Sequence, residues 1–405
     1  MNPEQPRPAP AKGRGATFNP DNRFGRLRRE AVGDDVPLHD VRLHDARLHG
    51  ARLHDARLHD ATRADAEGDA APRAVTTTVT ITRARTIVMR NDSPDVPFTQ
   101  SINPYQGCEH GCIYCYARPS HAYLDLSPGI DFETQLFAKP DAADLLRAEL
   151  ARPGYRCDPI ALGTNTDPYQ PIERDWRITR AVLEVLAQCR HPFTIVTKSA
   201  LIERDIDLIA PMAAQRMARV YVSVTTLDRE LARKMEPRAA SSQRRLQAIG
   251  TLARAGIPVG VMVAPVIPQL NDRDLEAIVA AAAAEGATSA GWVLLRLPRE
   301  VSPLFRGWLD LHYPDRAAHV MSLVSQMRGG RDNDPAFGSR MRGEGPVAAL
   351  FARRFELACR RHRLARGREQ HGLDTTRFEP PHPPRRRSTA HQGDLFDDVP
   401  ASGAN

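Results

Sequence analysis

The chain has 405 residues and a formal net charge of +7, from 56 Lys and Arg against 49 Asp and Glu. Hydrophobic residues make up 41% of it, enough for a sizeable core, but no stretch approaches the ~18 consecutive apolar residues of a spanning helix. Six cysteines are too few for a disulfide scaffold, and the N-terminus lacks the apolar core of a secretory signal. We therefore expect no membrane or disulfide-rich secreted protein, but a cytoplasmic enzyme.

Residues 1–75 differ in composition from the rest of the chain. They open with a Pro-rich segment and continue with a five-residue repeat, LHDVRLHDARLHGARLHDARLHDA, from Leu38 to Ala61. A period of five matches neither the ~3.6 residues per turn of an α-helix nor the alternation of a strand, so no continuous apolar face forms. The sequence predicts that residues 1–75 are disordered.

From residue 76 onward, short apolar runs alternate with segments of helical periodicity. The strand-like runs cover residues 102–107, 159–164, 193–198, 219–225, 258–264 and 291–297. The helical segments between them cover residues 141–152, 176–190, 202–216, 241–255 and 272–286. Most runs are apolar on both faces, as in a parallel sheet covered by helices. Six such units predict an α/β fold, a partial (β/α)6 barrel of the TIM type over residues 76–340, with its active site at the C-terminal ends of the strands.

The chain ends in a helical region and a second polar tail. Residues 303–378 have helical patterns that include the Arg-rich segment 352–368. We predict a helical extension over residues 341–378 and a disordered tail over residues 379–405. The tail contains Arg385–Arg387, enough added charge to bind phosphates, although a solvated helix face gives the same Arg-rich pattern.

The strongest local signal is C-x3-C-x2-C over Cys108, Cys112 and Cys115, after the first predicted strand. Three thiolates so close in sequence can wrap around one inorganic centre. A four-iron cluster with three cysteine ligands leaves one iron open, as a catalytic metal site requires. The alternative is structural zinc with His110 or His121 as the fourth ligand, although zinc ribbons use paired C-x2-C motifs and no second pair occurs here. The spacing favours an open [4Fe–4S] cluster.

At this loop the sequence resembles the radical S-adenosylmethionine (SAM) superfamily, whose signature has the same spacing with an aromatic residue, here Tyr114, before the last cysteine. Further segments are similar to its spore photoproduct lyase branch: NPYQGCEHGCIYCYARPSHAY, TNTDPYQPIE, TIVTKS, SVTTLD and MVAPVIPQLND. The similarity is greatest to a widespread bacterial subfamily of that branch, which also shares GRGATFNPDNRF at residues 13–24. It extends from residue 76 to about residue 350.

This resemblance implies two cofactors, a [4Fe–4S] cluster and SAM. The open iron would bind the amino and carboxylate groups of SAM, and an electron from the cluster would cleave SAM to methionine and a 5′-deoxyadenosyl radical that takes hydrogen from a substrate. The resemblance places the SAM site at the strand ends, with Lys198 for the carboxylate and Ser223, Asn165, Thr166, Asp167 and Ala264 beside it. Residues 165–167 would also fit an ordinary turn with an Asx cap.

Two tyrosines flank the last cysteine of the motif. In spore photoproduct lyases, residues matching Tyr114 and Tyr116 are implicated in SAM packing and in the return of a hydrogen atom, although buried aromatic residues also simply shield a cluster. The sequence departs from that branch at Thr164, where those lyases have a cysteine hydrogen donor, and Cys157 precedes the strand. The same thymine-dimer repair is therefore not expected.

The C-terminal tail contains a short peptide, QGDLF, with Gln392, Leu395 and Phe396. It resembles the Q-x-x-L-F peptide by which bacterial DNA polymerases and repair proteins bind the sliding clamp. With the resemblance to a DNA-repair lyase, it predicts the DNA sliding clamp and nucleic acid as partners. The radical chemistry implies an electron donor such as flavodoxin or ferredoxin.

Three functions are consistent with these features. The first is a radical SAM enzyme that acts on a base in DNA or, failing that, in RNA. The second keeps the chemistry but acts on a peptide or a small metabolite. The third is a non-catalytic zinc-binding module recruited to DNA. The identity of the metal separates the third from the other two.

Overall fold

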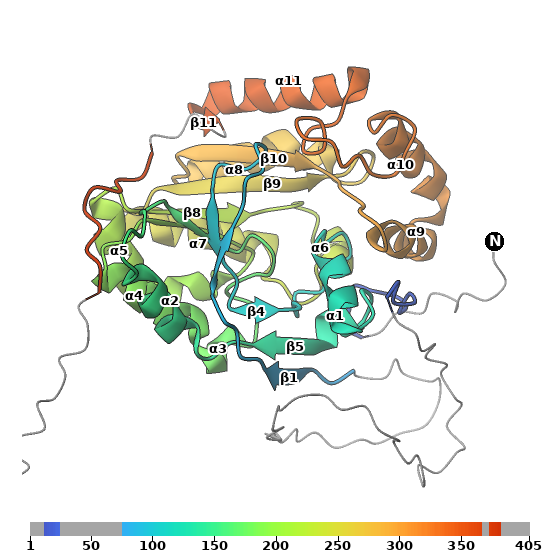
Figure 1. Ribbon diagram of the computed structural model, residues 1–405. Coiled ribbons are helices and arrows are strands. Elements are labelled where there is room, and N and C mark those ends of the chain that lie inside the picture. Colours follow the sequence, from blue (N-terminus) through green and yellow to red (C-terminus); the bar gives the residue numbers. More distant parts are fainter. Residues whose placement is uncertain (1–11, 25–74, 367–371, 382–405) are drawn as a thin grey trace, which may run out of the picture.

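The computed structural model describes residues 12–24, 75–366 and 372–381, and the histidine repeat and the clamp-like peptide lie outside these ranges (Figure 1). In the described part of the chain, an open eight-stranded sheet forms the centre, and its central strands are parallel and in sequence order. These strands are β3 (Gln100–Ile102), β6 (Ile160–Leu162), β7 (Phe193–Thr197), β8 (Ala218–Ser223), β9 (Val259–Val266) and β10 (Ser289–Leu294). They confirm the predicted α/β fold with a partial (β/α)6 barrel.

Short strands complete the two edges of this sheet and form a smaller one beside it. β2 (Val88–Arg90) pairs antiparallel with β3, and β11 (Ala365–Arg366) pairs parallel with β10. The smaller sheet joins β1 (Thr78–Ile81), β5 (Gln135–Ala138) and β4 (Tyr105–Gln106). The predicted strand 102–107 is therefore wrong as one element, because Pro104 has no N–H to continue a ladder and the chain moves there from the large sheet to the small one.

Helices connect the strands and cover the sheet. Those between β5 and β10 are α2 (Ala142–Leu150), α3 (Glu173–Trp176), α4 (Ile178–Gln188), α5 (Ile206–Ala214), α6 (Arg229–Met235), α7 (Ser242–Arg254) and α8 (Leu275–Ala284). Those after β10 are α9 (Val301–His312), α10 (Pro314–Gln326) and α11 (Gly345–His362). α2, α4 and α5 lie side by side, and α11 packs on α8 at the other end of the sheet (Figure 1). No helix in the described ranges is long and apolar enough to cross a membrane.

The burial pattern explains why these residues form these elements. β8 buries five of its six residues, which is typical of a parallel strand covered on both faces. α4 instead buries one stripe, including Ile178, Val182, Leu183 and Leu186, at the three- and four-residue spacing of an amphipathic helix. The two patterns together place the main hydrophobic core between the sheet and its helices.

Two terminal segments pack on the barrel. Residues 14–18 are buried, so the prediction that residues 1–75 form one disordered region is wrong for this stretch. The apolar side chains of Ala16 and Phe18 account for the difference, because they join the core around the cysteines. At the other end of the chain, Phe378 packs against Tyr155, with ring centroids 5.4 Å apart.

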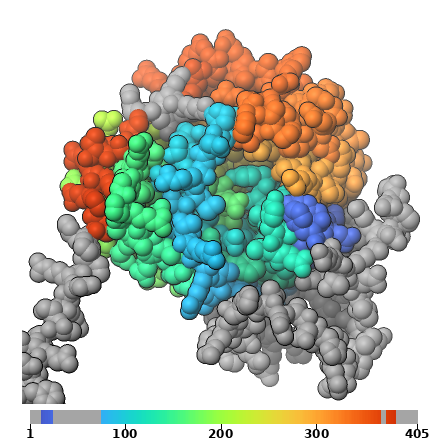
Figure 2. All heavy atoms as spheres, in the orientation of Figure 1, coloured from blue at the N-terminus to red at the C-terminus, as the bar shows by residue number. Residues whose placement is uncertain are grey.

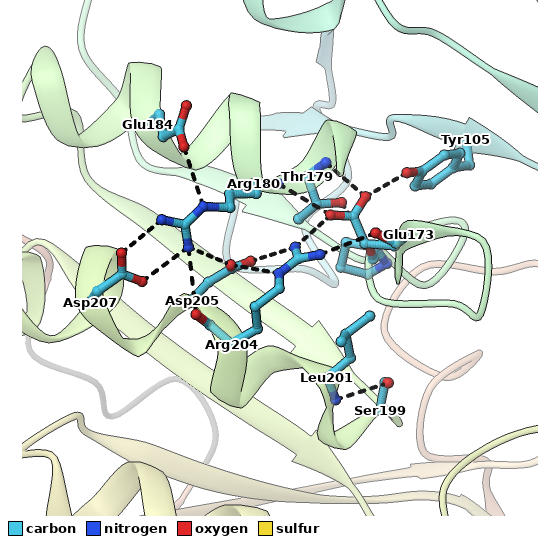
Figure 3. Close-up of polar contacts among 11 residues, drawn as sticks. Tyr105, Glu173, Thr179, Arg180, Glu184, Ser199, Leu201, Arg204, Asp205 and Asp207 are labelled. Atoms are coloured by element: carbon cyan, nitrogen blue, oxygen red, sulfur yellow. Dashed lines mark hydrogen bonds and ion pairs between the residues drawn. The ribbon is translucent and has the colours of Figure 1, made fainter. Parts of the chain in front are cut away.

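A buried polar network connects the segments that follow β6 and β7 (Figure 3). The carboxylate of Glu173, which is fully buried, accepts hydrogen bonds from the Tyr105 hydroxyl, from Thr179 N at 2.9 Å and from the Arg204 guanidinium at 2.6 Å. Arg204 also pairs with the buried Asp205 at 2.8 Å. Because a buried carboxylate is tolerated only when it is paired and hydrogen-bonded, this network fixes how the two segments lie against each other.

Removing the Glu173 carboxylate leaves Arg204 without one of its two partners. Since breaking a buried pair costs about 3 kcal/mol or more, we expect Glu173→Ala to lower the melting temperature by roughly 5 °C. The matched control is Glu184→Ala, which removes an exposed partner of Arg180 and should change the melting temperature by less than about 2 °C. Differential scanning fluorimetry compares them, and equal melting temperatures would show that the network does not stabilise the fold.

Candidate active site

The C-x3-C-x2-C motif forms a loop, residues 108–115, that directly follows β4 and is called the cysteine loop here. Cys108 and Cys112 are buried and Cys115 is half-buried. The loop turns at Gly111, whose φ of +67° favours glycine, and a Cβ at this position would lie 2.8 Å from Glu133 Oε2. The loop therefore has a defined path, and its three thiols face one region.

The three thiols of the loop lie near one another. Burial raises the pKa of Cys108, and the neighbouring Asp167, Cys112 and Cys115 raise it further. Lys198 acts in the opposite direction on Cys112. Three neighbouring thiols fit a [4Fe–4S] cluster, in which each thiolate binds a different iron.

A buried ion pair contacts the backbone of the cysteine loop and holds the loop in position. Arg118 and Glu133 are both fully buried and form an ion pair. Arg118 also donates from Nε and Nη2 to the Cys112 carbonyl, at 3.0 and 2.9 Å, and from Nη1 to the Gly129 carbonyl at 2.8 Å. The pair thus connects the loop to α1 (Asp131–Thr134), and no local sequence pattern predicts it.

The same carboxylate binds the N-terminal segment, residues 12–24. Glu133 accepts hydrogen bonds from Gly15 N at 2.9 Å and Ala16 N at 2.8 Å. A Cβ on Gly15 would lie only 1.7 Å from the Gly111 carbonyl oxygen, so only glycine fits where this segment crosses the cysteine loop. Figure 2 shows the segment in dark blue, at the surface between the teal residues that follow the loop and the orange helices. The contact explains physically why GRGATF accompanies the cysteine motif.

The residues predicted at the ends of β6 and β7 meet the cysteine loop. Both oxygens of the Asp167 carboxylate already accept hydrogen bonds within the protein. The donors are Tyr169 N at 2.9 Å, Thr197 Oγ1 at 2.7 Å and Lys198 N at 2.7 Å. His110 of the loop lies 3.4 Å from Asp167 Oδ2. Burial alone would raise the pKa of Asp167, but His110 and these hydrogen bonds outweigh it and lower the pKa to about 2. This geometry suits a residue that positions the loop better than one that contacts a ligand.

Asn165 and Thr166 have similar internal partners. The Asn103 side chain accepts from Asn165 N at 3.1 Å, and Thr166 Oγ1 donates to the Tyr105 carbonyl at 2.9 Å. Residues 165–167 therefore form an ordered turn that ties the end of β6 to the start of the cysteine loop. These contacts are typical of an ordinary turn, which was the alternative to a SAM-binding role for residues 165–167.

Lys198 lies at the end of β7 and faces the cysteine loop, as predicted. Its Nζ is 5.8 Å from the centroid of the Tyr114 ring. Burial would lower the pKa of Lys198, but attraction to Cys112 and to Glu236 outweighs it and raises the pKa. The site thus contains a protonated amine next to the thiols, available to an anionic ligand.

A second buried carboxylate, Glu236, was not predicted from the sequence. It accepts hydrogen bonds from the Tyr114 hydroxyl and from Thr225 Oγ1, the latter at 2.6 Å, and it forms an ion pair with Arg245. Arg245 also donates to the Ser223 carbonyl at 3.1 Å. Burial opposes ionisation of Glu236, but Arg245 and Lys198 overcome it and lower its pKa to about 2. Tyr114 and the end of β8 are therefore fixed by one ion pair.

The remaining predicted residues lie at the same edge of the sheet. Ser223 is the last residue of β8 and is buried, and Ala264 lies near the end of β9, where its carbonyl accepts from Thr225 Oγ1 at 3.4 Å. Tyr116 is 47% exposed, and its hydroxyl donates to the Thr164 carbonyl after β6. The Arg296 guanidinium carbon, after β10, lies 5.4 Å from the centroid of the Tyr116 ring, so Tyr116 contacts the chain after both β6 and β10.

The contact at Gly15 yields a direct test of the N-terminal segment. Gly15→Ala places a methyl group against the Gly111 carbonyl, so residues 12–24 must leave the loop. We expect trypsin to cleave after Arg14 about tenfold faster in this variant, as judged by mass spectrometry. Gly372→Ala, where an added Cβ meets nothing within 4 Å, is the control and should digest like the parent chain. Unchanged cleavage in Gly15→Ala would disprove the contact.

Comparison with known proteins agrees with this geometry. A model described as the radical SAM superfamily matches residues 102–282. An uncharacterized protein of Mycobacterium tuberculosis is 39% identical over 260 residues, which are 64% of this chain and 75% of the relative. One of Methanocaldococcus jannaschii is 29% identical over 171 residues, 42% of this chain and 61% of that protein.

Solved structures agree on the fold. Spore photoproduct lyase complexed with dinucleoside spore photoproduct aligns with a TM-score of 0.51 and 15% identity, over 71% of this chain and 80% of the lyase. A mutant of that lyase with bound SAM and the same dinucleoside aligns with the same score and coverage. The matched family model spans the cysteine loop and the ends of β6 to β9, where the predicted site residues lie. The chain therefore belongs to the radical SAM superfamily, whose cofactors are a [4Fe–4S] cluster and SAM.

Proposed function

We propose that this chain is a radical SAM enzyme that abstracts hydrogen from a base in a nucleic acid. The observation that carries the chemistry is the cysteine loop beside a protonated Lys198 at the C-terminal ends of the strands. The nucleic-acid part is supported by the shared fold with spore photoproduct lyase, a structure that contains a dinucleoside. No feature of the described residues favours a peptide or a small metabolite in the same way.

The site residues would bind the two cofactors. Cys108, Cys112 and Cys115 would ligate three irons of the cluster, which supplies the electron that cleaves SAM when both are bound. The Lys198 ammonium would pair with the SAM carboxylate, a charge-assisted contact in a partly dry site. Ser223 and the backbone at Ala264 would line the SAM pocket at the ends of β8 and β9.

The other predicted residues would position the cluster and SAM ligands or contact the substrate. Asp167 and Thr166 would position the cysteine loop and β7, because their polar atoms are already bonded within the protein. Tyr114 would fix one wall of the site through its bond to Glu236. Tyr116 would contact the substrate, because its ring is exposed directly after the last cysteine of the loop.

The reaction would differ from that of spore photoproduct lyase. Thr164 occupies the position of the lyase cysteine, and in the described ranges Cys157 lies ahead of β6, away from the C-terminal ends of the strands. A one-electron donor such as flavodoxin or ferredoxin would reduce the cluster. Docking on a DNA sliding clamp through Gln392, Leu395 and Phe396 stays a prediction from the sequence.

The role of Lys198 can be tested by binding. Lys198→Gln removes the charge that faces the SAM carboxylate, and since a hydrogen bond to a charged group contributes about 1.5–3 kcal/mol, the Kd for SAM should rise roughly tenfold to a hundredfold. Isothermal titration of anaerobic, iron-loaded protein measures this Kd. Lys234→Gln, which changes a surface lysine paired with Glu230, is the matched control and should bind SAM normally. Equal affinities in the two variants would remove Lys198 from the SAM site.

The substrate class can be tested by turnover. Reduced, iron-loaded protein with SAM should form 5′-deoxyadenosine at least about tenfold faster with single-stranded DNA than without, because substrate stabilises the reactive geometry. RNA, an acidic peptide and buffer alone are run in parallel, with product measured by liquid chromatography. Stimulation by the peptide but by neither nucleic acid would contradict the proposal.

A further inference from the structure

The exposed aromatic residues of the described chain share one feature. Its large exposed aromatic side chains are Phe24, Tyr116, Tyr123 and Phe337. Each of these rings has an arginine guanidinium over it, with the guanidinium carbon 4.5 to 5.4 Å from the ring centroid. Arginine and aromatic side chains together are the surface on which single-stranded nucleic acids bind, through phosphate contacts and base stacking.

Two of these pairs lie near the C-terminal end of β10. Arg296 follows β10 and covers Tyr116, while Arg340 covers Phe337, which is 60% exposed. The two arginines are close enough for Arg340 to lower the pKa of Arg296, after the larger effect of burial. The segment that contains Arg340 is tied to β10 by the hydrogen bond from Leu294 N to the Met341 carbonyl, 2.9 Å long.

Arg296 lacks an acidic partner among the described residues. Its Nε is buried without any hydrogen bond, and its Nη1 has only the Met341 sulfur at 3.7 Å, a weak acceptor. Asp95 is the nearby acid, but its Oδ2 accepts from Arg340 and its Oδ1 accepts from Gly338 N at 2.8 Å. Arg296 thus feels the charge of Asp95 only at a distance, and a partly buried guanidinium with an unused donor favours a ligand that accepts from it.

A third arginine adds to the positive charge. Arg328 is buried and uses its donors on backbone carbonyls, including those of Leu295 at 2.6 Å and Arg340 at 2.7 Å. Burial and the charge of Arg296 lower its pKa to about 10. Arg328 thereby joins the end of β10 to the segment that contains Arg340.

We propose that Arg296 binds a backbone phosphate of a single-stranded nucleic acid, with neighbouring bases stacked at Phe337 and Tyr116. The inference rests on the proposed function and identifies where its substrate docks. Phosphate suits the Arg296 guanidinium because its planar set of N–H donors matches the phosphate oxygens, whereas Arg340 is held by Asp95 and Ser93 and orders the neighbouring segment. The stacking position at Tyr116 would bring one base to the cysteine loop, since this tyrosine directly follows Cys115. A peptide carboxylate would satisfy the arginines but would leave both exposed rings without a stacking partner.

The test measures binding of a fluorescein-labelled oligothymidylate of about 12 nucleotides to iron-loaded protein, by anaerobic anisotropy at several salt concentrations. Arg296→Gln should weaken binding about tenfold and reduce the salt dependence by about one released counterion. Phe337→Ala should weaken binding about tenfold with an unchanged salt dependence, because stacking releases no counterion. Arg353→Gln on α11 is the matched control, since Arg353 is exposed and paired with Glu356, and should change affinity less than about twofold.

The outcomes separate this inference from the proposed function. Iron content and melting temperature of each variant establish that it is folded. If the parent chain binds the oligonucleotide and both Arg296→Gln and Phe337→Ala bind it equally well, the docking site is wrong while the function stands. If a polyglutamate peptide binds the parent chain more tightly than the oligonucleotide, the arginines take carboxylates and the inference is overturned. If the parent chain does not bind the oligonucleotide and turns over no faster with DNA or with RNA, both proposals fail.

Discussion

The arrangement of this site depends on one buried ion pair, Arg118 with Glu133. Arg118 binds the carbonyls of Cys112 and Gly129, while Glu133 binds the backbone of Gly15 and Ala16. Three separate stretches of chain thereby meet at one charge pair that has no access to water. Because an unpaired charge there would cost several kcal/mol, none of the three can move without disturbing the others. The cysteine loop is in this way fixed before any cofactor binds.

Buried carboxylates also hold the chain in position on the other side of the site. Asp167 and Glu236 are ionised carboxylates whose oxygens are occupied by protein donors, and both lie against the cysteine loop or Lys198. Both carboxylates are occupied by protein donors, whereas Lys198 and Arg296 have no ion-pair partner within the described ranges. This distribution of charge is consistent with the proposed anionic ligands, a carboxylate at Lys198 and a phosphate at Arg296.

The sequence predicted the features that depend on neighbouring residues and missed those that depend on contacts between residues far apart in the chain. Cys108, Cys112 and Cys115 lie within one short loop whose spacing predicts a cluster, and Lys198 directly follows an apolar strand, where the family resemblance predicts the SAM carboxylate. Glu236 and Glu133 could not be identified, because they belong to the site through contacts with Tyr114 and Ala16, which are 122 and 117 residues away. The strands from β6 to β10 were predicted within a few residues because burial on both faces leaves an unbroken apolar run. The first strand was misjudged because Pro104 divides it between two sheets.

The central claim is that the cysteine loop holds a [4Fe–4S] cluster whose open iron binds SAM. It is tested most directly by electron paramagnetic resonance of anaerobically reconstituted, dithionite-reduced protein with and without SAM. The account predicts a [4Fe–4S]⁺ signal that changes when SAM is added and that is lost in Cys112→Ala but kept in Cys157→Ala. Stoichiometric zinc in the purified protein, with no reconstitutable iron and no response to SAM, would contradict it.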